Sequence, residues 1–127
     1  FSKIGLIPDS GGTWTLPRLV GFQRASALMM TGDKVGAAEA RSMGMIYKVY
    51  ATDTFGEQVT ALAEQMAQMP TKGLALTKAA LNASGTNYIT DQLSLEETLQ
   101  TEAGQTYDFN EGVKAFLEKR APKFKGQ

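Results

Sequence analysis

The stretch that decides the fold is Leu6–Trp14, which reads LIPDSGGTW. Pro8 and the Gly11–Gly12 pair punctuate the backbone, so a tight turn is predicted between a short apolar run and a helix. Two consecutive glycines let the main chain take positive φ and let a ligand come close. Asp9 lies in this turn and is the only carboxylate among the first 32 residues.

Two interpretations of the turn are open at this point. Asp9 or Ser10 could simply cap the following helix, since short polar residues accept hydrogen bonds from the first free N–H groups. Alternatively, Asp9 is a functional carboxylate beside a helix start that favours an anion.

Composition narrows the chemistry further. The 127 residues are 43% hydrophobic and 20% charged, which fits one compact globular domain. Thirteen Lys and Arg balance thirteen Asp and Glu, which argues against an electrostatic nucleic-acid or membrane partner. The chain has no Cys and no His, so thiolate chemistry, imidazole triads and His-ligated metals are excluded within it. Carboxylates remain as the acid–base groups, and the acidic residues 91–102 are interpreted as a solvated helix face, with no metal expected.

No apolar run approaches the roughly 20 residues that a membrane span needs, and no signal peptide opens the chain. A cytoplasmic location is therefore expected.

The first half of the chain predicts short elements. Residues 3–8 have the pattern of the end of a buried segment, and residues 45–50 alternate as a strand does. Helices are predicted after the turn up to Gly21, over 22–31 with Gly32 as its C-terminal cap, and over 36–43.

From Thr52 the pattern is wholly helical. Apolar residues at 55, 59, 62, 66 and 69 form one continuous stripe. Further helices are predicted over 72–83, 90–103 and 108–120. Three N-terminal caps are predicted, namely a Thr54–Glu57 capping box, Thr71, and an Asp108–Glu111 capping box.

An ordered set of motifs spans the chain. It consists of residues 1–14, Leu16–Gly21, Arg24–Ala25, Leu28–Gly32, Ala37–Gly44, Pro70–Thr71 and residues 111–122. In order and spacing these motifs resemble the crotonase (enoyl-CoA hydratase/isomerase) superfamily, and most of all its ring-opening enoyl-CoA isomerases of phenylacetate breakdown.

The resemblance implies an α/β fold, the crotonase ββα spiral. The chain begins at Phe1 and opens where the family's chain is about half complete, so it is expected to be the C-terminal half, mostly α-helical with one or two short strands. Residues 1–69 would belong to the spiral core and residues 70–127 to an α-helical trimerisation region. Family members assemble as trimers, often paired into hexamers, so a homo-oligomer is expected.

The resemblance also implies a proton shift on an acyl-CoA thioester, in phenylacetate or fatty-acid breakdown. Two backbone N–H groups hold the thioester oxygen so that an enolate can form. They lie upstream of this stretch in the family, so the chain alone is expected to be inactive. Asp9 matches the acid/base of the isomerases.

Three alternatives stay open beside the isomerase. Hydratases of the family use two glutamates, and the second falls at Phe1, which favours an isomerase. Another class uses an aspartate at the position of Asp9 as a nucleophile that expels halide from an aryl-CoA ring. A non-catalytic helical interaction module, with Asp9 only a cap, would explain the amphipathic helices but not the ordered motifs.

Two residues near the end match those that reach the adenine end of CoA in the family. Phe116 would stack on adenine and Lys119 would contact phosphate, and their spacing of three places both on one face of a helix. The alternative is that Phe116 belongs to the helix core and Lys119 complements the helix dipole. No separate cofactor is expected, because CoA is part of the substrate.

Overall fold

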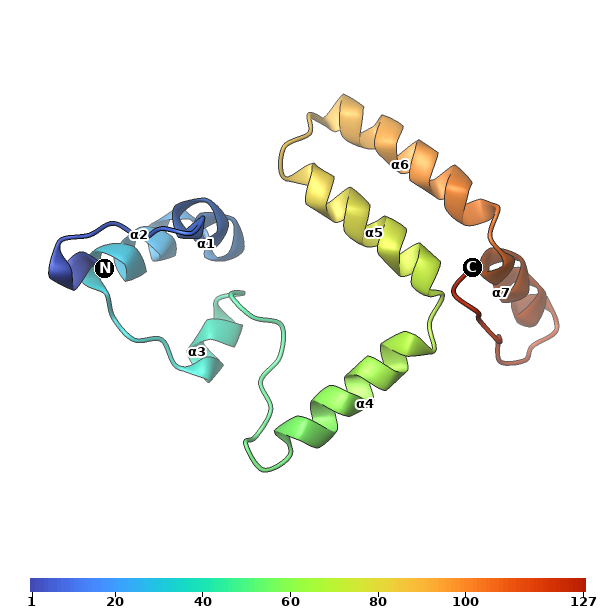
Figure 1. The fold of residues 1–127 in the computed structure, drawn as a ribbon, viewed down its shortest axis with the longest axis horizontal. Coiled ribbons are helices and arrows are strands. Elements are labelled where there is room, and N and C mark those ends of the chain that lie inside the picture. The colour runs from blue at the N-terminus through green and yellow to red at the C-terminus, as the bar shows by residue number, and fades with distance from the viewer. The chain divides into compact units, whose positions relative to one another are not determined.

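The computed structural model describes residues 1–127, with seven α-helices and one short 3₁₀ helix (Figure 1). It divides into two compact units, Phe1–Phe55 and Gly56–Gln127, called here the N-terminal and C-terminal units. The predicted predominance of helix is confirmed. None of the helices combines the length and the apolar character needed to cross a membrane.

The N-terminal unit contains η1 (Ser2–Ile4), α1 (Gly12–Val20), α2 (Phe22–Thr31) and α3 (Ala37–Ser42). Helices α1 and α2 meet at Gly21 and pack on each other, burying Val20 and Ala25. The predicted helix over 22–31 is confirmed, and so is its cap. Gly32 takes φ 64° and its N–H donates to the Leu28 carbonyl at 3.0 Å.

The strand predicted over residues 45–50 is wrong, because the segment is irregular and no strand forms anywhere in the chain. A strand needs a neighbour to satisfy its N–H and C=O groups, and these 127 residues supply none. The prediction of a buried segment over 3–8 is also wrong for this chain. Ile4 and Ile7 are 75% and 79% exposed, since no element of the unit covers them.

The C-terminal unit is built from α4 (Phe55–Ala67), α5 (Thr71–Ser84), α6 (Ile89–Gly104) and α7 (Tyr107–Leu117). Helices α5 and α6 lie side by side and antiparallel as a hairpin (Figure 1). An ion pair between Lys72 and Glu102, at 2.5 Å, joins their far ends. At the turn end, the Gln92 amide donates to the Ala80 carbonyl at 3.1 Å.

All three predicted N-terminal caps are wrong. Helix α5 has Pro70 at its N-cap without a side-chain bond, and the Thr54 hydroxyl donates to the Ala51 carbonyl instead of accepting at the start of α4. At α7 the cap is Thr106, whose hydroxyl oxygen accepts from the Phe109 N–H at 3.0 Å. Asp108 therefore lies inside the first turn of α7, where its side chain takes another role.

The apolar stripe of α4 exists and stays largely exposed in the chain, although the Phe55 ring meets the Tyr50 ring edge-on at 6.4 Å. Phe55, Val59, Met66 and Met69 are 40–56% exposed. The compact units divide between Phe55 and Gly56, whereas the predicted regions divide at Pro70, so α4 lies in the C-terminal unit. The assignment of residues 1–69 to a spiral core and 70–127 to trimerisation concerns the assembled enzyme and stays a prediction.

Candidate active site

The turn that carries Asp9 is closed by one backbone hydrogen bond, from the Gly12 N–H to the Asp9 carbonyl at 2.8 Å. Its two central residues, Ser10 and Gly11, have φ of 52° and 80°. Positive φ at both central positions is the geometry of a type I′ turn, which favours glycine. The predicted tight turn is thus confirmed, and Ser10 adopts a conformation uncommon for a residue with a side chain.

Asp9 does not cap α1. The N-cap is Gly11, which has no side chain to accept a bond, and α1 starts at Gly12. The one hydrogen bond of the Asp9 carboxylate comes from the Ser10 hydroxyl to Oδ1, at 3.1 Å. The side chain is exposed, so Oδ2 is free to accept a proton. This finding removes the interpretation of Asp9 as a structural cap.

Gly12 lies close to Pro8 and to α2, although a side chain there would meet only ordinary contacts. A Cβ added to Gly12 would lie 3.7 Å from the Pro8 side chain and 4.0 Å from the end of Met29 on α2. The turn therefore lies beside Met29 of α2.

Arg18 is a residue of this region that the sequence analysis missed. Its guanidinium stacks 3.8 Å from the Trp14 ring centre and donates to the Trp14 carbonyl at 2.8 Å. The sequence contained a signal for this contact: Trp14 and Arg18 are four residues apart on a predicted helix, a spacing that can bring a cation over an aromatic ring. Trp14 remains 50% exposed, so part of the stacked ring is accessible, five residues after Asp9 in the chain.

The second candidate region lies in the C-terminal unit. Phe116 is 83% exposed, so no element of this chain buries its ring, and its contact with adenine stays a prediction. It lines a pocket of about 520 Å³ together with Gly112, Val113, Leu117 and Phe124, among others. Lys119 is exposed but does not line this pocket. Because α7 ends at Leu117, the helical spacing that was predicted to align Phe116 with Lys119 does not extend to Lys119.

Two carboxylates near the start of α7 hold the segment that follows the helix. Asp108 is 2% exposed and accepts from the Lys125 and Gly126 N–H groups at 2.6 and 2.8 Å. Glu111 accepts two bonds from the Arg120 guanidinium, at 2.6 and 2.9 Å. The sequence analysis had placed both residues only in a capping box.

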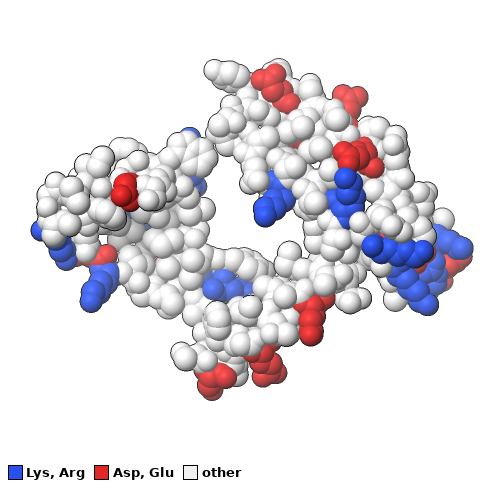
Figure 2. Space-filling view, in the orientation of Figure 1, with Lys and Arg blue, Asp and Glu red and all other residues white.

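The ion pair changes the ionisation of both partners. The Arg120 hydrogen bonds, helped by the Lys123 N–H, lower the pKa of Glu111 to about 2. The same contact, with a further bond to Glu118, raises the pKa of Arg120. Cations gather over α7 and the following segment in Figure 2, so an anionic ligand would meet a favourable field there.

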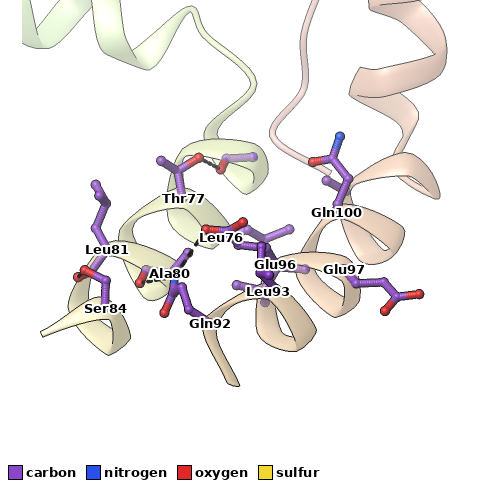
Figure 3. A pocket seen from close by; sticks show the side chains of 13 residues that line it. Leu76, Thr77, Ala80, Leu81, Ser84, Gln92, Leu93, Glu96, Glu97 and Gln100 are labelled. Atoms are coloured by element: carbon purple, nitrogen blue, oxygen red, sulfur yellow. Dashed lines mark hydrogen bonds between the residues drawn. The ribbon is translucent and has the colours of Figure 1, made fainter. Parts of the chain in front are cut away.

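A groove between α5 and α6 is another hollow of the C-terminal unit, with a volume of about 660 Å³. Figure 3 shows side chains of the two helices, Leu76, Ala80 and Leu93 among them, lining it. Its only charged residues are Glu96 and Glu97, which would repel phosphate. No cluster of three or more His, Cys, Asp or Glu side chains in the chain could hold a metal ion.

Comparison with known proteins identifies the family of the chain. The family profile described as enoyl-CoA hydratase/isomerase matches residues 1–127. The 1,2-epoxyphenylacetyl-CoA isomerase of Escherichia coli (strain K12) is 46% identical over the whole chain, which covers 48% of that protein. A probable enoyl-CoA hydratase of Rhodobacter capsulatus is also 46% identical over the whole chain, which covers 49% of it.

Among solved structures, a putative enoyl-CoA hydratase from Streptomyces coelicolor A3(2) matches with a TM-score of 0.94 and 34% identity. The match covers 100% of this chain and 46% of that one. These are half-length matches to crotonase-fold enzymes, the superfamily that the ordered set of sequence motifs resembles.

The chain belongs to the enoyl-CoA hydratase/isomerase family, within the crotonase superfamily. It spans about half the length of the curated relatives it matches. The expectation that it is the C-terminal half stays a prediction.

Proposed function

We propose that the protein containing this chain shifts a proton, and with it a double bond, on an acyl-CoA thioester, with Asp9 as the acid/base. The observation that supports this proposal is that the Asp9 carboxylate is exposed in a hydrogen-bonded tight turn and caps no helix. Its single bond, from Ser10, orients Oδ1 and leaves Oδ2 for the substrate proton.

The proposed chemistry has two steps. Asp9 takes a proton from a carbon of the acyl chain, and the electron pair moves into the thioester carbonyl as an enolate. Two backbone N–H groups stabilise that oxygen, as the family resemblance implies, and they are expected in residues outside this chain. The protonated Asp9 then returns the proton to a different carbon, which shifts the double bond.

Phe116 and Lys119 are proposed to bind the CoA part of the substrate. The support is the 83% exposure of the Phe116 ring and the cations over α7 and the following segment (Figure 2). A flat aromatic ring stacks on adenine, and an ammonium attracts phosphate. Trimeric or hexameric assembly, a cytoplasmic location and the lack of any separate cofactor remain proposals that follow from the family.

The acyl group is proposed to come from phenylacetate breakdown, because of the 46% identity with the 1,2-epoxyphenylacetyl-CoA isomerase. Fatty-acid breakdown is the other source. Hydration is the second candidate reaction, because an equal identity links the chain to a probable enoyl-CoA hydratase.

Product analysis separates the two reactions. The full protein is incubated with an enoyl-CoA in water enriched in ¹⁸O, and the products are analysed by mass spectrometry. An isomerase gives a product of unchanged mass with a moved double bond, whereas a hydratase gives a hydroxyacyl-CoA that contains ¹⁸O. Appearance of the ¹⁸O product as the main one would exclude the isomerase assignment.

Residues 1–127 alone are proposed to be inactive, because the oxyanion donors are expected elsewhere. Loss of even one such donor typically lowers turnover by about 10²–10³-fold. Isomerase activity from the purified 127-residue chain, confirmed free of longer protein by mass spectrometry, would contradict this proposal.

A further inference from the structure

Helix α7 ends in a cap that normally contains glycine but here contains lysine. The Arg120 N–H donates to the Ala115 carbonyl at 3.0 Å, and the Lys119 N–H donates to the Phe116 carbonyl at 3.2 Å. These two bonds define a Schellman motif, whose C′ residue takes the left-handed conformation. Lys119 occupies that position with φ 54°, a strained conformation for a residue with a Cβ.

The next residue, Arg120, is fixed by three hydrogen bonds to two carboxylates. The Arg120 guanidinium makes both Nη bonds to Glu111, and its Nε donates to Glu118 at 2.6 Å. The Glu111 side chain is 9% exposed and also accepts from the Lys123 N–H at 2.8 Å. The backbone on either side of Arg120 is therefore tied to the body of α7.

The segment beyond is held as well. Asp108 accepts the N–H groups of Lys125 and Gly126, and the Phe124 ring covers Gly112, where an added Cβ would lie 3.6 Å away. Lys119 thus protrudes between two anchored stretches, the helix before it and the segment after it. Strain of this kind persists only where the surroundings over-determine it, and it gathers at functional sites.

We propose that Glu111 and Arg120 are positioning residues, whose ion pair holds Lys119 in its left-handed conformation and so presents the ammonium to a phosphate of the CoA thioester. This inference rests on the proposed CoA contact of Lys119. The pair does not touch the ligand itself. The ion pair orders the backbone at Lys119 before the ligand binds, so less conformational entropy is lost on binding.

The negative charge of Glu111 lets one variant distinguish positioning from long-range electrostatics. Glu111→Gln in the full enzyme removes a negative charge near an anionic ligand, so long-range electrostatics alone would lower the Michaelis constant. Loss of positioning would raise it instead. We expect a rise of about fivefold for a CoA thioester with unchanged kcat, and no change for a pantetheine thioester, which lacks the nucleotide phosphates.

The matched control is Glu102→Gln, which breaks the Lys72–Glu102 ion pair of the same unit. It should leave both Michaelis constants unchanged. Two further variants keep the test valid if Glu111→Gln folds poorly. Arg120→Lys keeps the charge but loses the two-pronged contact, so an intermediate rise is expected. The exchange Glu111→Arg with Arg120→Glu restores the pair and should recover part of the affinity.

Lys119 variants separate this inference from the function on which it rests. Lys119→Ala should raise the Michaelis constant for the CoA thioester by about tenfold and leave the pantetheine thioester unaffected. Lys119→Gly should do the same and also raise the melting temperature, because glycine relieves the positive φ. If Lys119→Ala has no effect, the CoA contact is wrong and the positioning role falls with it.

If Lys119→Ala behaves as expected while the Glu111 and Arg120 variants leave the Michaelis constant unchanged, the positioning role alone is overturned. A fall in kcat, or an equal rise for both thioesters, would mean that the ion pair supports only the fold. That result also overturns the inference.

Discussion

At the scale of single residues, the backbone conformation of the turn determines which hydrogen bonds the Asp9 carboxylate makes. Gly11 takes φ 80° and also the N-cap position, so the residue that terminates the turn cannot contribute a capping side chain. Asp9 is thereby left with the Ser10 hydroxyl as its one partner. A carboxylate used for proton transfer needs this freedom, because a fully bonded one would resist protonation.

Asp9→Asn tests the acid/base role. The amide keeps the shape of the side chain but cannot accept a proton, so turnover of the full enzyme should fall by about 10²–10⁴-fold. The melting temperature should change little, since the side chain is exposed and makes one local bond. Asp33→Asn is the control, an exposed aspartate of the same unit that should keep full activity. Near-normal turnover of Asp9→Asn would refute the assignment.

Asp108 is the opposite case, a carboxylate committed to structure. Asn at this position offers one oxygen where two are used, so one of the N–H groups of Lys125 and Gly126 loses its partner. An unpaired buried donor costs about 1–3 kcal/mol, and Asp108→Asn should lower the free energy of unfolding by that amount. Urea titration of the full protein measures it. Asp53→Asn, in an exposed turn, should stay within about 0.5 kcal/mol, and equal losses for the two variants would contradict the structural role.

The sequence could predict the turn at Asp9 and the Gly32 cap of α2, but not which residues cap the helix N-termini. Proline and a glycine pair restrict the backbone locally, so the turn at Asp9 follows from composition. A cap depends on the conformation of one residue at the helix boundary, and boundaries shift by one or two positions with packing. Hence Thr106, not Asp108, accepts the bond at α7. Because Asp108 does not cap the helix, its carboxylate can accept the Lys125 N–H, seventeen residues later in the chain. No local sequence pattern contains this contact.

At the scale of elements, α7 and the segment after it form a unit closed by the Glu111–Arg120 ion pair. The pair lowers the pKa of Glu111 from 4.5 to about 2. Because the folded-state pKa is the lower one, the pair contributes its stability in full above about pH 4.5. That contribution is lost as the pH falls through the window between about 4.5 and 2.

Glu111→Gln should therefore be less stable than the wild type at pH 7, with a difference that shrinks below pH 4.5 and disappears near pH 2. The urea midpoints of the two proteins, compared at several pH values, test this. A ¹³C NMR titration of the Glu111 carboxyl gives the pKa directly. A difference that stays constant from pH 7 to pH 2.5, or a pKa near 4.5, would contradict the role of the ion pair.

The elements themselves were predicted well wherever local signals suffice. The helices over 22–31, 72–83 and 90–103 correspond to α2, α5 and α6 within one residue at each end. Helical periodicity is a property of neighbouring residues, so a single sequence contains it. The predicted strand over 45–50 failed because strand formation depends on a distant partner. The left-handed conformation of Lys119 could not be predicted for the same reason. In our proposal it depends on Arg120, which is held by Glu111, nine residues earlier.

At the scale of the whole molecule, the chain leaves much apolar surface uncovered. The α4 stripe is the clearest case, with Phe55 56% and Met66 49% exposed on one face of the helix. Contiguous exposed apolar faces mark surfaces that other protein covers. If the protein functions as the family resemblance implies, two kinds of protein surface could cover the α4 stripe: the rest of the same enzyme and neighbouring subunits.

The last prediction concerns this face. Residues 1–127 alone should self-associate as their concentration rises, because association removes the α4 stripe from water. Burial of one methionine side chain stabilises by about 1.5–3 kcal/mol, so Met66→Lys should weaken association by roughly tenfold to a hundredfold. Light scattering coupled to size-exclusion chromatography gives the mass at each concentration. Thr60→Lys adds the same charge on α4 away from the stripe and should leave the association unchanged. If the unsubstituted chain stays monomeric at all concentrations, or if both lysine variants weaken association equally, the stripe is not the surface through which copies of the chain meet.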